Sequence, residues 1–164
     1  MILVTVGTDM PFDRMMKVVD RWAAERGRQE VFAQIGEGGL EPRHIPFVNF
    51  FEPVEFKQRF ASANLIIGHA GMGTILSALL HGKPILVMPK LARLGEHRNE
   101  HQTATAKRMM ALGNVNVAFD EDEMLAKLAV VDSLQARGPI APHASGPLVE
   151  GIRNFIFNGK GTPP

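Results

Sequence analysis

The chain has 164 residues, the length of one domain, and its 45% hydrophobic and 21% charged residues are typical of a globular protein. It contains no cysteine, which excludes a disulfide scaffold, a cysteine nucleophile and a thiolate metal site. A formal net charge of +1 argues against a general nucleic-acid binder, because such proteins are strongly basic.

Short apolar runs rich in β-branched residues alternate along the chain with stretches of helical periodicity. Strands are predicted over residues 2–6, 30–35, 45–51, 65–67, 84–88 and 114–119. Helices are predicted over residues 11–25, 55–63, 74–81, 98–112, 121–128 and 148–157. This alternation is typical of an α/β, Rossmann-like domain, so we expect a mostly parallel six-stranded sheet with helices on both faces, in one domain over residues 1–164.

No segment of the sequence has the features of a membrane anchor or a signal peptide. The apolar run over residues 2–6 is short and has no basic residues before it. No apolar run approaches the roughly 20 residues that a transmembrane helix needs. We therefore expect any work at a membrane to depend on a partner.

The first candidate ligand loop follows the first predicted strand. Parallel sheets bind ligands at the carboxyl ends of their strands. Gly7 lets the backbone approach a ligand closely, and Thr8 adds a hydroxyl group next to a helix start. The alternative is a tight turn in which Thr8 or Asp9 caps the helix.

A second loop, His-Ala-Gly-Met-Gly-Thr over residues 69–74, lies between a predicted strand and a predicted helix. The backbone N–H groups of Met72, Gly73 and Thr74 would lie at the positive end of that helix, where a diphosphate binds well. Leu76 stands where the dinucleotide fingerprint has its third glycine, and no Walker motif is present. The loop thus disfavours an ordinary dinucleotide or ATP-hydrolysis site, while a turn set only by packing stays open.

A third segment, residues 90–108, holds five Lys and Arg residues against two Glu, a local charge of +3. Its polar side chains are concentrated at a predicted helix start and suit an anionic, polyhydroxylated ligand. We predict that Arg98, Asn99 and His101 bind this ligand. The alternative is a solvated helix end, the usual place for a run of charges.

No metal site is predicted. Asp120 and Asp122 have the D-x-D spacing of some metal sites, but they open a helix, where acidic residues act as caps. His97 and His101 have the i, i+4 spacing that can bind zinc, but no third ligand accompanies them.

Four motifs occur in order: Val-Thr-Val-Gly-Thr at 4–8, residues 69–74, Gly-Lys-Pro-Ile-Leu-Val-Met-Pro at 82–89, and His-Arg-Asn-Glu-His-Gln at 97–102. Together they resemble the C-terminal, nucleotide-sugar-binding domain of GT-B glycosyltransferases, in the branch that adds N-acetylglucosamine to the peptidoglycan lipid precursor. The similarity covers about residues 1–128. It is strongest to stand-alone subunits: those of split dolichyl-diphosphate N-acetylglucosamine transferases and of bacterial exopolysaccharide glucuronosyl- and galactosyltransferases.

The resemblance implies a UDP-sugar donor substrate and neither a cofactor nor a metal. It places Gly7 and Thr8 along the diphosphate and Phe51 against the uracil. The implied phosphate site at the helix start is formed by Gly71, Met72, Gly73 and Thr74. His97 and Gln102 are the implied polar groups of catalysis near the donor sugar. Ser77 stands where the family often has a glutamate that binds the ribose, which puts ribose binding in question.

The resemblance also implies a reaction and a partner. We expect an inverting, metal-independent transfer of a hexose-type sugar to a lipid-linked acceptor. A membrane-anchored, acceptor-binding subunit would supply the general base and hold this chain at the inner, cytoplasmic face of the membrane; a homo-oligomer stays open. The alternatives are a non-catalytic UDP-sugar-binding or scaffold subunit of a polysaccharide-synthesis complex, and a nicotinamide-dependent oxidoreductase, which the incomplete glycine pattern disfavours.

Overall fold

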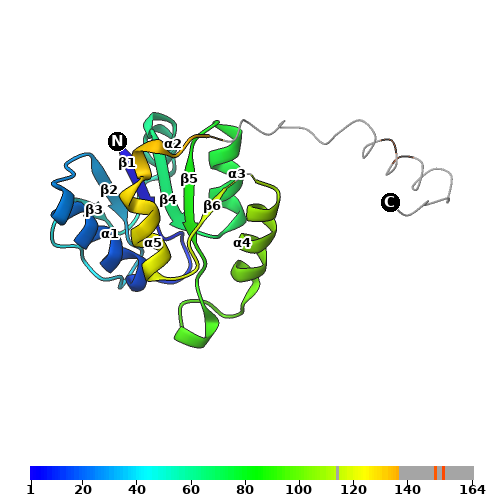
Figure 1. Ribbon diagram of the computed structural model, residues 1–164, viewed down its shortest axis with the longest axis horizontal. Helices are drawn as coiled ribbons and strands as arrows, with labels where there is room; N and C mark the ends of the chain where they lie inside the picture. Colours follow the sequence, from blue (N-terminus) through cyan, green and yellow to red (C-terminus); the bar gives the residue numbers. More distant parts are fainter. Residues whose placement is uncertain (114, 137–149, 151–152, 154–164) are drawn as a thin grey trace.

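The computed structural model describes residues 1–113, 115–136, 150 and 153. It contains a six-stranded sheet in the order β3-β2-β1-β4-β5-β6, and every neighbouring pair is parallel (Figure 1). The strands are β1 (Ile2–Thr5), β2 (Val31–Gln34), β3 (Phe47–Val48), β4 (Leu65–His69), β5 (Ile85–Met88) and β6 (Asn116–Val117). The predicted α/β, Rossmann-like sheet is confirmed.

The chain changes direction across the sheet between β1 and β4. From β1 it moves outward through β2 and β3, and then it returns to pair β4 with the other side of β1. Ile2 is consequently in register with Val31 on one side and with Leu65 on the other. The loops after β1 and β4 leave this point in opposite directions, which opens a crevice at the carboxyl ends of the two strands.

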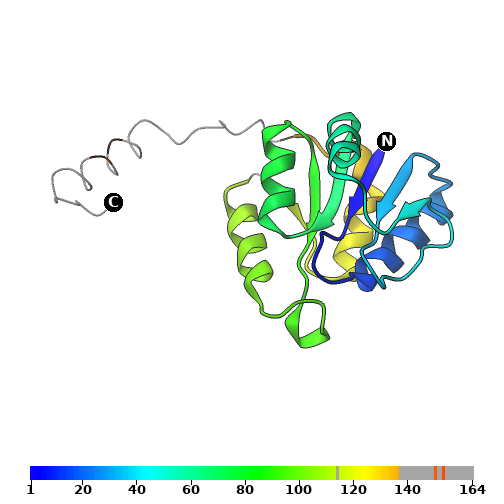
Figure 2. The ribbon, with the colours of Figure 1, turned by 180° about the vertical axis from the view of Figure 1, so that it is seen from behind.

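Helices cover both faces of the sheet (Figures 1 and 2). On one face, α1 (Asp13–Arg26) and α5 (Glu121–Ala129) bury residues such as Trp22 and Met124 against Val4 and Ile67. The other face is covered by α2 (Pro53–Ser62), α3 (Met72–Leu80) and α4 (His101–Ala111). All residues of β1 and β5 are buried, as expected for central parallel strands covered on both faces.

Element ends differ from the predictions mainly at the edges of the sheet. β3 and β6 are two residues each and are shorter than the predicted runs 45–51 and 114–119. Each has a neighbouring strand on one side only, so fewer hydrogen bonds fix its ends. The helix predicted over residues 148–157 lies outside the described residues except for Glu150 and Arg153.

The helix predicted from residue 98 begins at His101 instead. The Asn99 side chain accepts a hydrogen bond from the His101 N–H at 3.2 Å, and the Asn99 N–H donates to Nδ1 of His97 at 3.4 Å. These local bonds hold a turn in place of the first helical turn. Two short 3₁₀ helices, η1 (Ala92–Leu94) and η2 (Val131–Ser133), complete the described elements. None of the described helices combines the length and the apolar character needed to cross a bilayer.

Candidate functional site

The loop after β1 is fixed from both sides at Gly7. Its N–H donates to the Thr5 hydroxyl at 3.3 Å, and its carbonyl accepts from Nε2 of the buried Gln34 at 3.2 Å. Gly7 has a φ of 84°, which other residues rarely adopt. The backbone therefore turns sharply at the strand end and exposes Thr8 and Asp9.

His69, the last residue of β4, stands between two glycines. A Cβ atom at position 7 would lie 2.6 Å from Cε1 of His69, and one at position 71 would lie 2.1 Å from Nε2. Both distances are far below van der Waals contact. The first and second loops therefore meet at the imidazole ring of His69, and both glycines are needed to admit it.

The imidazole of His69 is neutral at physiological pH. Burial lowers its pKa to about 4, and the positive charge of Lys90 adds to this shift. Within the described part of the chain, Nδ1 of His69 is buried without a hydrogen-bond partner. The base of the site thus carries a neutral polar ring between two close backbone segments.

The amino end of α3 follows directly from this ring. Gly71 is the N-cap residue, and no side chain of the described residues caps the first turn. The N–H groups of a helix's first turn lack partners within the helix and carry a partial positive charge. Gly73 has open space where a side chain would be, so the backbone there is accessible.

Aromatic side chains form another part of the site. Phe51 lies between Phe32 and Phe56, with ring centroids at 5.6 Å and 6.3 Å. The guanidinium carbon of Arg59 lies 4.3 Å from the Phe32 ring centroid and 5.0 Å from that of Phe51. This stacking holds the rings in place, and Phe50 beside them is 43% exposed.

These features enclose a cavity of about 490 Å³ at the crevice between β1 and β4. Its walls combine aromatic side chains with a smaller number of polar groups. They are formed by Thr5, Gly7, Thr8, Gln34, Phe50, Phe51, Pro53, Phe56, His69, Gly73, Thr74 and Ser77. An apolar cavity with a few converging polar groups at this point of an α/β sheet is the usual form of a ligand site.

The segment after β5 lies beside this cavity and is anchored by buried polar groups. Lys90 is 1% exposed, and its ammonium group donates to the Met10 carbonyl. Burial lowers the pKa of Lys90 to about 8, although Asp9 and Glu96 act in the opposite direction. The Lys90 N–H donates to Oε1 of Gln102 at 3.1 Å. Gln102 is therefore buried and ties α4 to the end of β5.

His97 and Arg98 face the first loop. Nε2 of His97 lies 3.8 Å from one oxygen of Asp9, and Nη2 of Arg98 lies 3.7 Å from the other. The rings of His97 and His101 meet edge to face at 4.6 Å. Because Asp9 follows Thr8, these side chains stand at the Thr8 end of the cavity.

The model of the glycosyltransferase family 28 C-terminal domain matches residues 1–137. The chain belongs to this family. Its matched region contains every element described above from β1 to η2, and thus the cavity and the segment that follows β5.

Curated relatives of this family 28 domain carry the name UDP-N-acetylglucosamine transferase subunit ALG13. The protein from Eremothecium gossypii is 41% identical over 69 residues, which are 42% of this chain and 32% of the relative. The Homo sapiens protein is 29% identical over 124 residues, 70% of this chain and 10% of the relative. The chain thus spans a third or less of the length of these relatives.

Solved structures agree on the fold. A solution structure of ALG13 has a TM-score of 0.57 at 20% identity and covers 92% of this chain and 93% of its own. The glycosyltransferase of kitacinnamycin has a TM-score of 0.61 at 21% identity and covers 80% of this chain and 34% of its own. The family 28 domain therefore has the fold of one half of a GT-B enzyme.

The structure divides the predicted site residues into two groups. The cavity is lined by five of them: Gly7, Thr8, Phe51, Gly73 and Thr74. Gly71 lies behind it against His69, and Met72 is 44% exposed on α3. The predicted residues of the third segment are outside the lining; they are His97, Arg98, Asn99, His101 and Gln102. Of these, Gln102 is enclosed, while His97 and Arg98 reach the rim through Asp9.

The sequence analysis did not identify Thr5, Gln34, Pro53 or Phe56 as cavity residues. Thr5 and Gln34 are the last residues of strands β1 and β2, so their position at the carboxyl edge is the one signal that indicated them. Their roles depend on the Gly7 turn, which no sequence spacing specifies.

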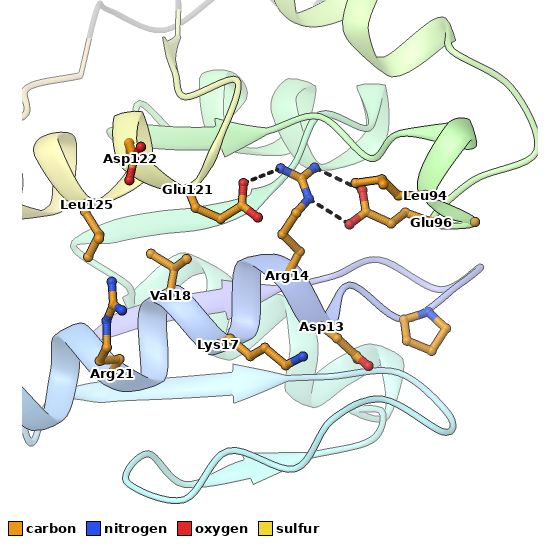
Figure 3. Close-up of a pocket in the computed structure, with 12 residues that line it drawn as sticks. Asp13, Arg14, Lys17, Val18, Arg21, Leu94, Glu96, Glu121, Asp122 and Leu125 are labelled. Atoms are coloured by element: carbon orange, nitrogen blue, oxygen red, sulfur yellow. Dashed lines mark hydrogen bonds and ion pairs between the residues drawn. The ribbon is translucent and has the colours of Figure 1, made fainter.

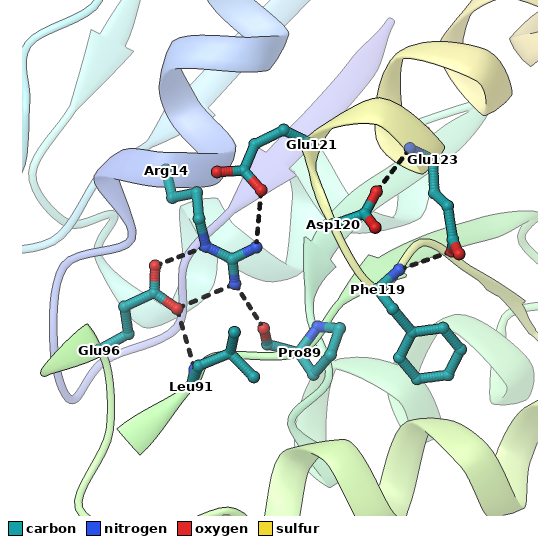
Figure 4. Close-up of polar contacts among 8 residues, drawn as sticks. All are labelled: Arg14, Pro89, Leu91, Glu96, Phe119, Asp120, Glu121 and Glu123. Carbon is teal, nitrogen blue, oxygen red and sulfur yellow. Dashed lines mark hydrogen bonds and ion pairs between the residues drawn. The ribbon is translucent and has the colours of Figure 1, made fainter. Parts of the chain in front are cut away.

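The acidic run after β6 forms a helix cap. Asp120 accepts a hydrogen bond from the Glu123 N–H at 2.8 Å, and Glu123 accepts one from the Phe119 N–H at 2.9 Å (Figure 4). This reciprocal pair confirms the predicted cap. Among residues 1–113, 115–136, 150 and 153, no group of three or more His, Asp or Glu side chains is arranged to hold a metal ion.

Proposed function

We propose that this family 28 domain is the donor-binding, catalytic subunit of a split glycosyltransferase that uses a UDP-sugar. The supporting observation is the cavity between β1 and β4, whose lining includes Gly73 and Thr74 of the α3 start, which no described side chain caps, together with aromatic side chains. A uracil ring fits beside Phe51, and a diphosphate fits at the N–H groups of Gly73 and Thr74. The donor sugar then extends toward His97.

The arrangement suggests how the leaving group is stabilised. In an inverting transfer, the acceptor hydroxyl attacks the anomeric carbon as the bond to the UDP oxygen breaks. Negative charge then grows on the diphosphate, and fixed N–H dipoles and cationic side chains stabilise it without reorganising. We propose that α3 and the segment 97–102 provide this stabilisation, and that the reaction is metal-independent and needs no cofactor.

A membrane-anchored partner completes the proposed enzyme. It would hold the lipid-linked acceptor, supply the general base that takes the acceptor proton, and keep this chain at the inner face of the membrane. The names of the ALG13 relatives, which include the word subunit, support an assembly of more than one chain.

Thermal unfolding with ligands tests the donor. A ligand that binds only the folded state raises the free energy of unfolding, by about 2.7 kcal/mol when its concentration is 100 times its Kd, and Tm rises with it. We expect UDP, UDP-N-acetylglucosamine, UDP-glucuronic acid or UDP-galactose to raise Tm and NAD to leave it unchanged. A rise with NAD and none with UDP would overturn the proposal in favour of an oxidoreductase.

A non-catalytic UDP-sugar-binding subunit is the second candidate, because Ser77, not a glutamate, lines the cavity. Sugar transfer to a lipid-linked acceptor, measured with the partner present, separates the two. The catalytic proposal expects His97→Ala to lower the transfer rate while the complex still forms. An unchanged rate in His97→Ala would show that the proposed site is wrong.

A further inference from the structure

Arg14, in the first turn of α1, connects three segments that are far apart in the sequence. Its Nε and Nη2 contact the two carboxylate oxygens of Glu96 at 2.8 Å and 2.9 Å. Nη2 also donates to the Pro89 carbonyl at 3.0 Å (Figure 4). Nη1 contacts Glu121 at 3.3 Å (Figures 3 and 4). The side chains of Arg14 and Glu96 are each 11% exposed, so this is a largely buried, two-pronged ion pair.

Glu96 in turn closes the loop after β5. Its Oε2 accepts a hydrogen bond from the Leu91 N–H at 2.9 Å, and its own N–H donates to the Leu91 carbonyl at 3.2 Å. The short helix η1 lies inside this closed loop. The position of Glu96 therefore sets the exit of the loop, and the next residue is His97.

The ends of the segment are held independently of Arg14. Lys90 is bonded to the Met10 carbonyl, and Gln102 receives the Lys90 N–H. Between these anchors, His97 contacts the first loop through the 3.8 Å approach of its Nε2 to Asp9. The ion pair of Arg14 with Glu96 is thus the fixed point nearest to His97.

We propose that Arg14 is a positioning residue for the donor site: through Glu96 it holds His97 against Asp9 at the rim of the cavity. This inference rests on the proposed function, because it takes His97 as a contact of the donor diphosphate, which UDP also carries. Loss of the guanidinium leaves the Glu96 carboxylate buried without its partner, which favours outward movement of the loop toward water. His97 then leaves Asp9.

Three variants and a matched control test the inference. Arg14→Met removes the ion pair, Arg14→Lys keeps a charge but not the two-pronged geometry, and Glu96→Gln weakens the pair from the other side. Arg21→Met is the control. Arg21 lies on the same helix as Arg14, and both side chains line a surface depression of about 740 Å³ (Figure 3). Its partner Glu25 is exposed and 3.8 Å away.

Binding by calorimetry and by NMR gives the first measurement. We expect Arg14→Met and Glu96→Gln to weaken UDP about tenfold and to leave uridine affinity unchanged. A general loss of folding would weaken both ligands alike. The double variant Arg14→Met/Glu96→Gln should bind UDP no more weakly than Arg14→Met alone, because Arg14 and Glu96 act as one unit. Arg21→Met should bind as the wild type.

Histidine ring NMR of the ligand-free protein gives the second measurement. The ring signals of His97 and His101 should move in Arg14→Met and Arg14→Lys, while those of His81 stay in place. Unmoved His97 signals, or wild-type UDP affinity in Arg14→Met, overturn the positioning role. If the wild type itself does not bind UDP, the proposed function fails, and the NMR comparison still decides whether Arg14 places His97.

Discussion

The imidazole of His69 occupies the space that a side chain at Gly71 would need, since a Cβ atom there would lie 2.1 Å from Nε2 of His69. A Cβ atom at position 7 would lie 2.6 Å from Cε1 of the same ring, so the two glycines confine the ring from both sides. Gly71 is therefore required by packing, whereas Gly73, two residues later, has nothing within 4 Å of its Cβ position.

The two glycines should respond differently to alanine. Gly71→Ala is expected to destabilise the fold by about 1–3 kcal/mol, the usual cost of overpacking, and to abolish UDP binding. Gly73→Ala should unfold at or above the wild-type temperature, because alanine is the better helix former. Urea unfolding and calorimetry measure the two effects. Equal stability of Gly71→Ala and Gly73→Ala would contradict the wedged position of His69.

His69 should make stability depend on pH between 6.5 and 4. Its pKa falls from 6.5 to about 4 on folding, so within this window the unfolded chain takes up a proton and the folded protein does not. The free energy of unfolding is therefore unaffected by His69 protonation above pH 6.5. It decreases as the pH falls to about 4, by up to about 3 kcal/mol.

The measurement is an NMR titration of the His69 ring together with unfolding curves over this pH range. His69→Gln should flatten the dependence of the unfolding free energy on pH. A ring that titrates near pH 6.5 in the folded protein would refute its buried, neutral state.

Asp20 on α1 should be the strongest single anchor of the glycine-rich loop after β2. Its carboxylate accepts hydrogen bonds from the N–H groups of Arg43, His44 and Ile45 at 2.8–3.2 Å, and it also contacts Nδ1 of His44 at 3.0 Å. Asp20→Asn is expected to lower stability by about 2–3 kcal/mol, because an amide places donors against these donors. Asp13→Asn is the control, since within the described residues Asp13 accepts a single hydrogen bond, from the Leu40 N–H, at an exposed position.

Asp20 should also make stability depend on pH, in a more acidic range than His69 does. Burial alone would raise the pKa of Asp20, but the hydrogen bonds from Arg43 and His44 outweigh it and hold the pKa below 3.8. Its contribution is therefore present above pH 3.8 and is lost as the pH falls through the lower, folded value. In Asp20→Asn the loss of stability below pH 3.8 should be smaller than in the wild type.

Phe51 should contribute to nucleotide affinity because its half-buried ring lines the cavity. Phe51→Leu is expected to raise the Kd for UDP about fivefold, as stacking contributes about 1 kcal/mol. Phe119→Leu is the matched control, because Phe119 is also half-buried against the same core cluster but does not line the cavity. If Phe51→Leu and Phe119→Leu bind UDP equally well, the uracil ring does not stack on Phe51.

The sequence alone determined the architecture and the part of the site that the start of α3 forms. Apolar runs such as residues 2–6 and 65–67 are short and nearly continuous, as in strands buried on both faces, and glycines follow them directly. Both the parallel sheet and the loops at its carboxyl edge could therefore be predicted. Gly73 and Thr74 were identified in this way because a helix start binds anions through its backbone, which depends on position in the element and not on distant contacts.

The tertiary structure decided what the polar side chains do. In the sequence, Gln102 and Lys90 resemble exposed residues that contact a ligand, yet both are buried. Gln102 joins α4 to the end of β5, and the Lys90 side chain joins that strand end to the first loop. The pairing of Arg14 with Glu96 joins residues 82 positions apart, and the fit of His69 between Gly7 and Gly71 joins two strands. Local propensity cannot specify such contacts, because they exist only when the sheet order brings β1, β4 and β5 side by side.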